Sequence, residues 1–170
     1  IWNIVPIKYN SLFQKNSDIY HFFNYIVPPH IRGNIITTIY DMSYKFYPET
    51  LDPKNLKRLK KDILYTVDRS DVIITISENA KREILEEFNI SEQKVKIVYP
   101  SFDITNNSQS FSFLQQKYKI TQKYILYVGN LEPRKNINRL ILAYKKLKKE
   151  MNIPYQLILA GQKGWLYDSI

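Results

Sequence analysis

The sequence contains no cysteine, and this absence excludes disulfide bonds and thiolate metal sites. Its two histidines, His21 and His30, are too few for a histidine-rich metal centre. The glycines form no Gly-x-Gly-x-x-Gly, Walker-type or Gly-x-Ser-x-Gly motif, so these short signatures of nucleotide binding and serine hydrolysis are missing. No apolar run approaches the roughly 20 residues of a membrane-spanning helix, and no signal peptide is recognisable. We therefore expect a cytoplasmic protein with no metal site.

The composition, in contrast, is that of a folded and basic protein. The 170 residues are 44% hydrophobic and 14% aromatic, which is enough to build a core. The formal net charge of +9 favours an anionic partner, such as nucleic acid, an anionic membrane surface or a phosphorylated small molecule. A generally basic surface without a specific partner is the alternative interpretation.

Strand and helix patterns alternate along the chain. Runs rich in β-branched and aromatic residues predict strands at 18–23, 34–40, 71–76, 95–99, 124–128 and 155–160. Asp52 and Pro53 predict a helix start, with Asp52 as N-cap, and Ser77 predicts the N-cap of a second helix. A third helix is expected at about 136–149. This alternation predicts an α/β fold with parallel sheets.

The chain is expected to contain parts of two domains. Residues 103–122 are of mixed polar and aromatic composition and predict a linker or loop with one weak helical turn. We place the first domain at 1–104, the linker at 105–122 and the second domain at 123–170. Fewer than fifty residues cannot cover both faces of a parallel sheet, so this piece either packs on the first unit or belongs to a domain that continues beyond Ile170. We expect the second alternative.

The segment 127–140, YVGNLEPRKNINRL, carries the strongest candidate site. Gly129 and Asn130 form a turn after a strand, and two adjacent cations, Arg134 and Lys135, follow just before a helix. Cations are unfavourable near a helix N-terminus unless an anion lies there, and arginine can bind a phosphate through two hydrogen bonds. The pattern indicates a phosphate site. The alternative is that both side chains extend into solvent or pair with Glu132.

Other polar residues also follow predicted strands, where ligands bind in open α/β sheets. Tyr40 and Asp41 could bind sugar hydroxyls or transfer a proton, although a turn or capping role is the simpler interpretation. Ser77 and Gly161 are further candidates. Ser77 is best explained as an N-cap, and Gly161 lies at the end of the last predicted strand. His21 lies between apolar residues and is interpreted as a core histidine.

Six segments in order resemble one enzyme family, the retaining GT-B glycosyltransferases of glycosyltransferase family four, in its mannosyltransferase-like group 1. The segments are Tyr20–Pro28, Ile36–Ser43 with Phe46–Glu49, Ser70–Lys81, Val95–Asp103, Tyr127–Asn136 and Leu157–Trp165. The resemblance implies two Rossmann-like domains, of which this chain holds the end of the first, the linker and the start of the second.

The resemblance also implies a function. Arg134, Lys135, Gly129 and Asn130 match the residues that bind the donor diphosphate, and no metal cofactor is required. The implied reaction transfers a sugar, with a hexose such as mannose expected, from a nucleotide sugar to a glycan or lipid-linked acceptor in surface polysaccharide synthesis. The family often has histidine at the position of Tyr40. The implied location is the cytoplasm, with peripheral association at the inner face of the membrane as a further expectation, and the fragment alone is expected to be inactive.

Two other functions remain open. The first is a non-catalytic α/β module that binds an anionic surface or a protein partner through lysine-rich helices, of which 54–61 is one. The second is another nucleotide-sugar enzyme on a similar plan, such as an epimerase. No nucleic-acid-binding pattern is present, so we expect no nucleic-acid partner.

Overall fold

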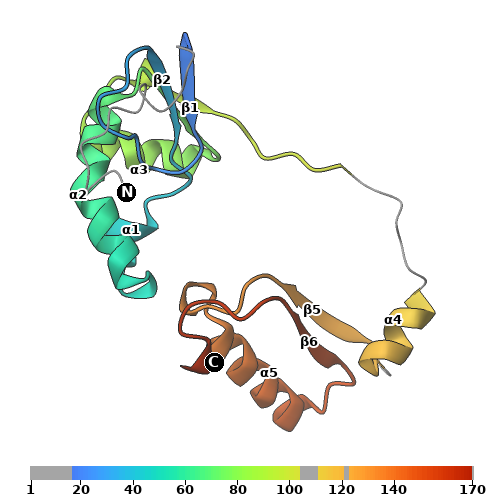
Figure 1. Cartoon of the computed structure of the whole chain (residues 1–170). Coiled ribbons are helices and arrows are strands. Elements are labelled where there is room, and N and C mark those ends of the chain that lie inside the picture. Colours follow the sequence, from blue (N-terminus) through green and yellow to red (C-terminus); the bar gives the residue numbers. More distant parts are fainter. Residues whose placement is uncertain (1–16, 104–110, 121–122, 170) are drawn as a thin grey trace. The chain divides into compact units, whose positions relative to one another are not determined.

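The computed structural model describes residues 17–103, 111–120 and 123–169 (Figure 1). Contacts between residues divide the chain into two compact units. Unit 1 contains the residues up to Pro48 and Asp52–Ser101, and unit 2 contains Phe102–Ile170 together with Glu49–Leu51. The predicted domain boundaries at 104, 105 and 122 fall in or beside the segments 104–110 and 121–122, which lie outside the described residues.

The described part of unit 1 is built on a parallel sheet with strand order β1-β2-β3-β4. The strands are β1 (Ile19–Phe22), β2 (Asn34–Thr38), β3 (Val72–Thr75) and β4 (Val95–Ile97). Ile36 pairs with Val72, and Ile73 pairs with Val95. The helices between them are α1 (Ser43–Phe46), α2 (Pro53–Arg69) and α3 (Glu78–Phe88), with short 3-10 turns η2 (Pro48–Thr50) and η3 (Glu92–Lys94). The predicted α/β class with parallel sheets is confirmed.

The core of unit 1 lies where the helices cover the sheet. Ile35 and Ile73 on the central strands are fully buried, and so is Ile84 on α3. Helix α2 contributes Ile63 and Val67. These side chains recur at the strand and helix periods from which the elements were predicted.

Both predicted N-caps of unit 1 are confirmed. The carboxylate of Asp52 accepts hydrogen bonds from the backbone N–H groups of Lys54 and Asn55, each at 3.0 Å. The hydroxyl of Ser77 accepts one from the N–H of Ala80 at 3.1 Å. Each bond satisfies an N–H group that has no partner inside its helix.

The described part of unit 2 contains α4 (Phe111–Tyr118), β5 (Tyr124–Val128), η4 (Pro133–Lys135), α5 (Ile137–Met151), β6 (Gln156–Ala160) and η5 (Tyr167–Ser169). Strands β5 and β6 are parallel and pair from Tyr124 with Gln156 to Val128 with Ala160. Helix α5 connects them, as the βαβ prediction required.

Helix α4 is the main difference from the prediction in this unit. Its eight residues lie where we expected a linker with one weak helical turn. Phe111, Leu114 and Tyr118 recur at helical spacing, and the ring of Phe111 lies 6.2 Å from that of Tyr124 at the start of β5. Packing against a strand stabilises a short helix whose local sequence signal is weak.

Candidate functional site

The loops that follow β5 and β6 are joined by backbone hydrogen bonds. The N–H of Gly129 donates to the carbonyl of Ala160 at 2.9 Å, and the N–H of Leu131 donates to the carbonyl of Gln162 at 2.9 Å. The N–H of Gly164 returns a bond to the carbonyl of Leu131 at 3.0 Å. The two loops therefore form one surface at the carboxyl ends of the parallel strands, where ligands bind in open α/β sheets.

Two predicted glycines permit this arrangement. Gly129 has a φ of 152°, a backbone conformation that other residues rarely adopt. A Cβ atom on Gly161 would lie only 1.8 Å from the carbonyl oxygen of Gly129. Gly161 thus lets the two loops approach each other, which is a structural role at the edge of the predicted site.

The two predicted cations lie on η4, directly before α5. Their turn is closed by backbone bonds from Lys135 N–H to the Glu132 carbonyl and from Asn136 N–H to the Pro133 carbonyl. The Nη2 atom of Arg134 lies 3.1 Å from Oε1 of Glu132, which is the ion pair that we had stated as the alternative. Both side chains are partly exposed, at 39% for Arg134 and 22% for Glu132, so the pair is open to exchange with another anion.

The start of α5 offers a positive helix end next to these cations. Asn136 has a φ of 55°, and its side chain makes no capping hydrogen bond. The first turn of α5 carries no acidic residue. An anion near Arg134 and Lys135 would therefore also be stabilised by the helix dipole. Asn130 lies in the same loop, where its carbonyl accepts a bond from the Tyr127 hydroxyl at 3.1 Å.

The structure adds Lys163 to this surface, a residue that our sequence analysis did not select. Lys163 forms a β-bridge with Leu131 in the neighbouring loop. Its Nζ atom lies 4.7 Å from the centre of the Tyr167 ring, a cation–π distance. The position of Lys163 after Gly161 was a signal that could have identified it, because parallel strands end at the same edge of a sheet.

The candidates Tyr40 and Asp41 lie on unit 1, after β2. The Oδ1 atom of Asp41 accepts hydrogen bonds from the N–H of Ser43 at 2.9 Å and from the hydroxyl of Tyr25 at 3.2 Å. The N–H of Asp41 donates to that same hydroxyl at 3.1 Å. Asp41 therefore shapes the turn into α1, and Tyr40 is 36% exposed with its ring 5.9 Å from that of Tyr25.

The remaining candidates have local structural partners. The hydroxyl of Ser77 caps α3, as described above. The Nε2 atom of His21 lies 3.0 Å from the Thr38 hydroxyl, and its ring stacks against Phe23 at 4.0 Å. Within 17–103, 111–120 and 123–169, no group of three or more histidine, aspartate and glutamate residues could hold a metal ion. No helix in these ranges is long and apolar enough to cross a membrane.

Comparison with known proteins relates the chain to sugar-transferring enzymes. Residues 110–169 match the family described as Glycosyl transferases group 1. The chain is 33% identical over 151 residues to the O-antigen chain mannosyltransferase B of Escherichia coli, which covers 86% of this chain and 39% of that protein. It is 29% identical over 168 residues to the serotype-specific mannosyltransferase WbdA of Escherichia coli, covering 94% of this chain and 20% of that protein.

One further match is to a protein that is not named as a glycosyltransferase. The chain is 35% identical over 99 residues to a lipoprotein signal peptidase of Buchnera aphidicola, covering 58% of this chain and 63% of that protein. The chain thus spans less than two fifths of the two mannosyltransferases and a larger share of the peptidase. The family match and the two longer alignments agree on the class of glycosyltransferases.

Proposed function

Since residues 110–169 match the glycosyl transferases group 1 family, we propose that this chain is part of a retaining GT-B glycosyltransferase of glycosyltransferase family four. We propose that it transfers a hexose such as mannose from a nucleotide sugar to a glycan or lipid-linked acceptor in surface polysaccharide synthesis. The mannosyltransferase relatives support the sugar and the pathway class.

The observation that carries this proposal is the pair of joined loops with their cations. Arg134, Lys135 and Lys163 lie on two hydrogen-bonded loops beside the open N-terminus of α5. In the proposed reaction the sugar–phosphate bond breaks and leaves negative charge on the diphosphate. Fixed cations and a helix N-terminus stabilise such charge where it develops, so these residues can do this without a metal ion.

The ion pair between Arg134 and Glu132 sets a condition for this role. The diphosphate must replace the Glu132 carboxylate as the partner of Arg134. A partly exposed ion pair contributes little stability, about 0–1 kcal/mol, while a phosphate can form two parallel bonds with a guanidinium group. The exchange therefore favours the phosphate.

The test measures binding of GDP and UDP to the chain by NMR, with the resonances of residues 129–136 and 161–164 as reporters. Arg134→Ala should weaken binding roughly 10- to 100-fold, because hydrogen bonds to charged groups contribute about 1.5–3 kcal/mol. Glu132→Gln should strengthen it, since the competing carboxylate is removed. Lys145→Ala is the matched control, because it removes one exposed lysine from the middle of α5 and should change little.

Two results would contradict the site. One is equal loss of affinity in Arg134→Ala and Lys145→Ala, which would indicate unspecific attraction to a basic protein. The other is unchanged donor use by the full-length enzyme that carries Arg134→Ala.

We propose that the protein associates peripherally with the inner face of the membrane, where a lipid-linked acceptor would be located. Helix α2 supports this, because Lys57, Lys60 and Lys61 are exposed on it together with Leu64, which is 67% exposed. Exposed lysines attract anionic lipids, and exposed apolar side chains insert among them. Salt-sensitive binding to phosphatidylserine vesicles without any effect of GDP or UDP would instead favour the non-catalytic module.

A further inference from the structure

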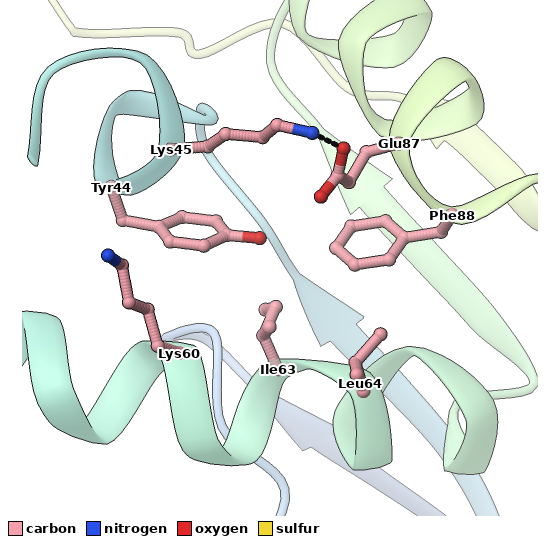
Figure 2. Close-up of a pocket in the computed structure, with 7 residues that line it drawn as sticks. All are labelled: Tyr44, Lys45, Lys60, Ile63, Leu64, Glu87 and Phe88. Atoms are coloured by element: carbon pink, nitrogen blue, oxygen red, sulfur yellow. Dashed lines mark ion pairs between the residues drawn. The ribbon is translucent and has the colours of Figure 1, made fainter.

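A pocket in unit 1 lies among α1, α2 and α3. Its volume is about 280 Å³, and its lining consists of Tyr44, Lys45, Lys60, Ile63, Leu64, Glu87 and Phe88 (Figure 2). This volume is near the lower limit of about 300 Å³ for small-molecule sites. The pocket can therefore hold one ring or a short chain, but not a nucleotide sugar.

The phenol of Tyr44 is the most unusual group in the pocket. Tyr44 is only 5% exposed, and its side chain points into the cavity in Figure 2. Its hydroxyl makes no hydrogen bond within the described residues, and its oxygen remains open to the pocket, since the fully buried side-chain atom that lacks a partner in this part of the chain is Thr75 Oγ1. An acceptor inside the pocket can therefore bind this hydroxyl directly, and such a hydrogen bond contributes about 0.5–1.5 kcal/mol.

The charged side chains of the lining favour an acceptor that carries negative charge. Lys45 forms an ion pair with Glu87 across the rim, from α1 to α3 (Figure 2). Lys60 on α2 has no such partner among the described residues and extends toward the same space (Figure 2). Two lysines and one glutamate leave a net charge of +1 around the pocket. Burial also raises the pKa of Tyr44, so this phenol remains a donor at neutral pH.

The rest of the lining is apolar. Ile63 is buried at 3% exposure, while Leu64 is 67% exposed and leaves apolar surface open to an occupant. Phe88 adds an aromatic ring from the end of α3. Such a surface binds a hydrocarbon ring or chain through the hydrophobic effect.

We propose that this pocket binds a small amphipathic anion, such as an arylalkyl or short-chain carboxylate. Its anionic group accepts a hydrogen bond from Tyr44 and pairs with Lys60, and its apolar part covers Ile63, Leu64 and Phe88. The pocket is lined by residues of unit 1 and shares none with the proposed donor-phosphate loops of unit 2, so this proposal does not depend on the proposed transferase function.

The experiment titrates the chain with three probes of equal apolar size: 4-phenylbutyrate, 4-phenylbutanol and 4-phenylbutylamine. NMR signals of the Tyr44 ring and of the Ile63 and Leu64 methyl groups report binding. The anion should bind two- to fivefold more tightly than the alcohol, because a partly exposed ion pair contributes up to about 1 kcal/mol. The amine should bind most weakly.

Two variants test the assigned residues. Lys60→Met keeps most of the side-chain stem and should abolish the preference for the anion while alcohol binding persists. Lys61→Met is the matched control, because Lys61 is exposed on α2 outside the pocket lining. Leu64→Ser changes an exposed residue that should not be needed for folding, and it should weaken all three probes.

Three results would overturn the proposal. They are equal binding of acid and alcohol, an equal effect of Lys60→Met and Lys61→Met, and shifts at Tyr44 that appear only with vesicles of phosphatidylserine and not with the soluble acid. The last result would assign the surface to lipid instead.

Discussion

Replacement of Gly161 by alanine should separate the two loops that carry the proposed phosphate site. An added Cβ would lie 1.8 Å from the Gly129 carbonyl oxygen and 2.7 Å from its carbon. Ordinary contact begins at 3.4 Å, so the backbones must move apart by 3.4 − 1.8 = 1.6 Å. That movement breaks the 2.9 Å bond from Gly129 N–H to the Ala160 carbonyl and strains the bond from Leu131 N–H to Gln162.

The expected loss of stability follows from these contacts. Two backbone hydrogen bonds contribute about 0.5–1.5 kcal/mol each, and overpacking adds about 1–3 kcal/mol. We therefore expect Gly161→Ala to reduce the free energy of unfolding by about 2–6 kcal/mol. With a urea m-value of about 2 kcal/mol/M, this corresponds to a fall of roughly 1–3 M in the midpoint of urea denaturation.

The assay follows the fluorescence of Trp165, which lies in the loop after β6. Trp2 and Trp165 are the two tryptophans of the chain, so Trp2→Phe provides a background with a single probe. Gly164→Ala is the matched control in the same loop, because its Cβ would meet its nearest atoms at 3.0 and 3.1 Å and needs shifts of only a few tenths of an ångström. We expect it to cost about 1 kcal/mol or less. Equal midpoints for the two alanine variants would refute the reasoning.

Three further predictions concern unit 1. Asp52→Ala should reduce the free energy of unfolding by about 0.5–2 kcal/mol in urea denaturation, because two N–H groups lose their acceptor, and Asp52→Asn should retain most of the stability. Burial raises the pKa of Tyr44 above 10.0, so the phenol ionises at lower pH in the unfolded chain than in the folded one. The free energy of unfolding should therefore fall as pH rises from about 10 through the folded-state pKa. Tyr44→Phe should remove this fall in urea titrations at alkaline pH. The hydrogen bond from Lys81 lowers the pKa of Glu92 below 4.5, so the carboxylate stabilises the fold above that pH and loses this effect as pH falls through the folded-state pKa. NMR titration of Glu92 should show that its pKa returns toward 4.5 in Lys81→Met.

Local features were predictable from the sequence because their causes are local. The β-branched runs 72–75 and 124–128 form strands, and the Asp52 and Ser77 caps act within three residues of themselves. The 3-10 turn over Pro133–Lys135 was not predicted, because three residues are too few to show a helical period and we described them only as part of the turn before the helix. Helix α4 was underestimated because the contact of Phe111 with Tyr124 lies outside the helix's own sequence and is not visible in its local pattern.

The sequence alone determined the alternation of strands and helices, the caps and the position of two cations after a strand. Only the tertiary structure showed that Lys163 lies beside the loop of Arg134, that Gly161 is required by the close approach of Gly129, and that the buried phenol of Tyr44 faces a pocket. These facts depend on contacts between residues more than 30 positions apart in the chain, such as Lys45 with Glu87 and Leu131 with Lys163. Such contacts arise from strand register and helix packing, which a linear pattern of residue types does not specify.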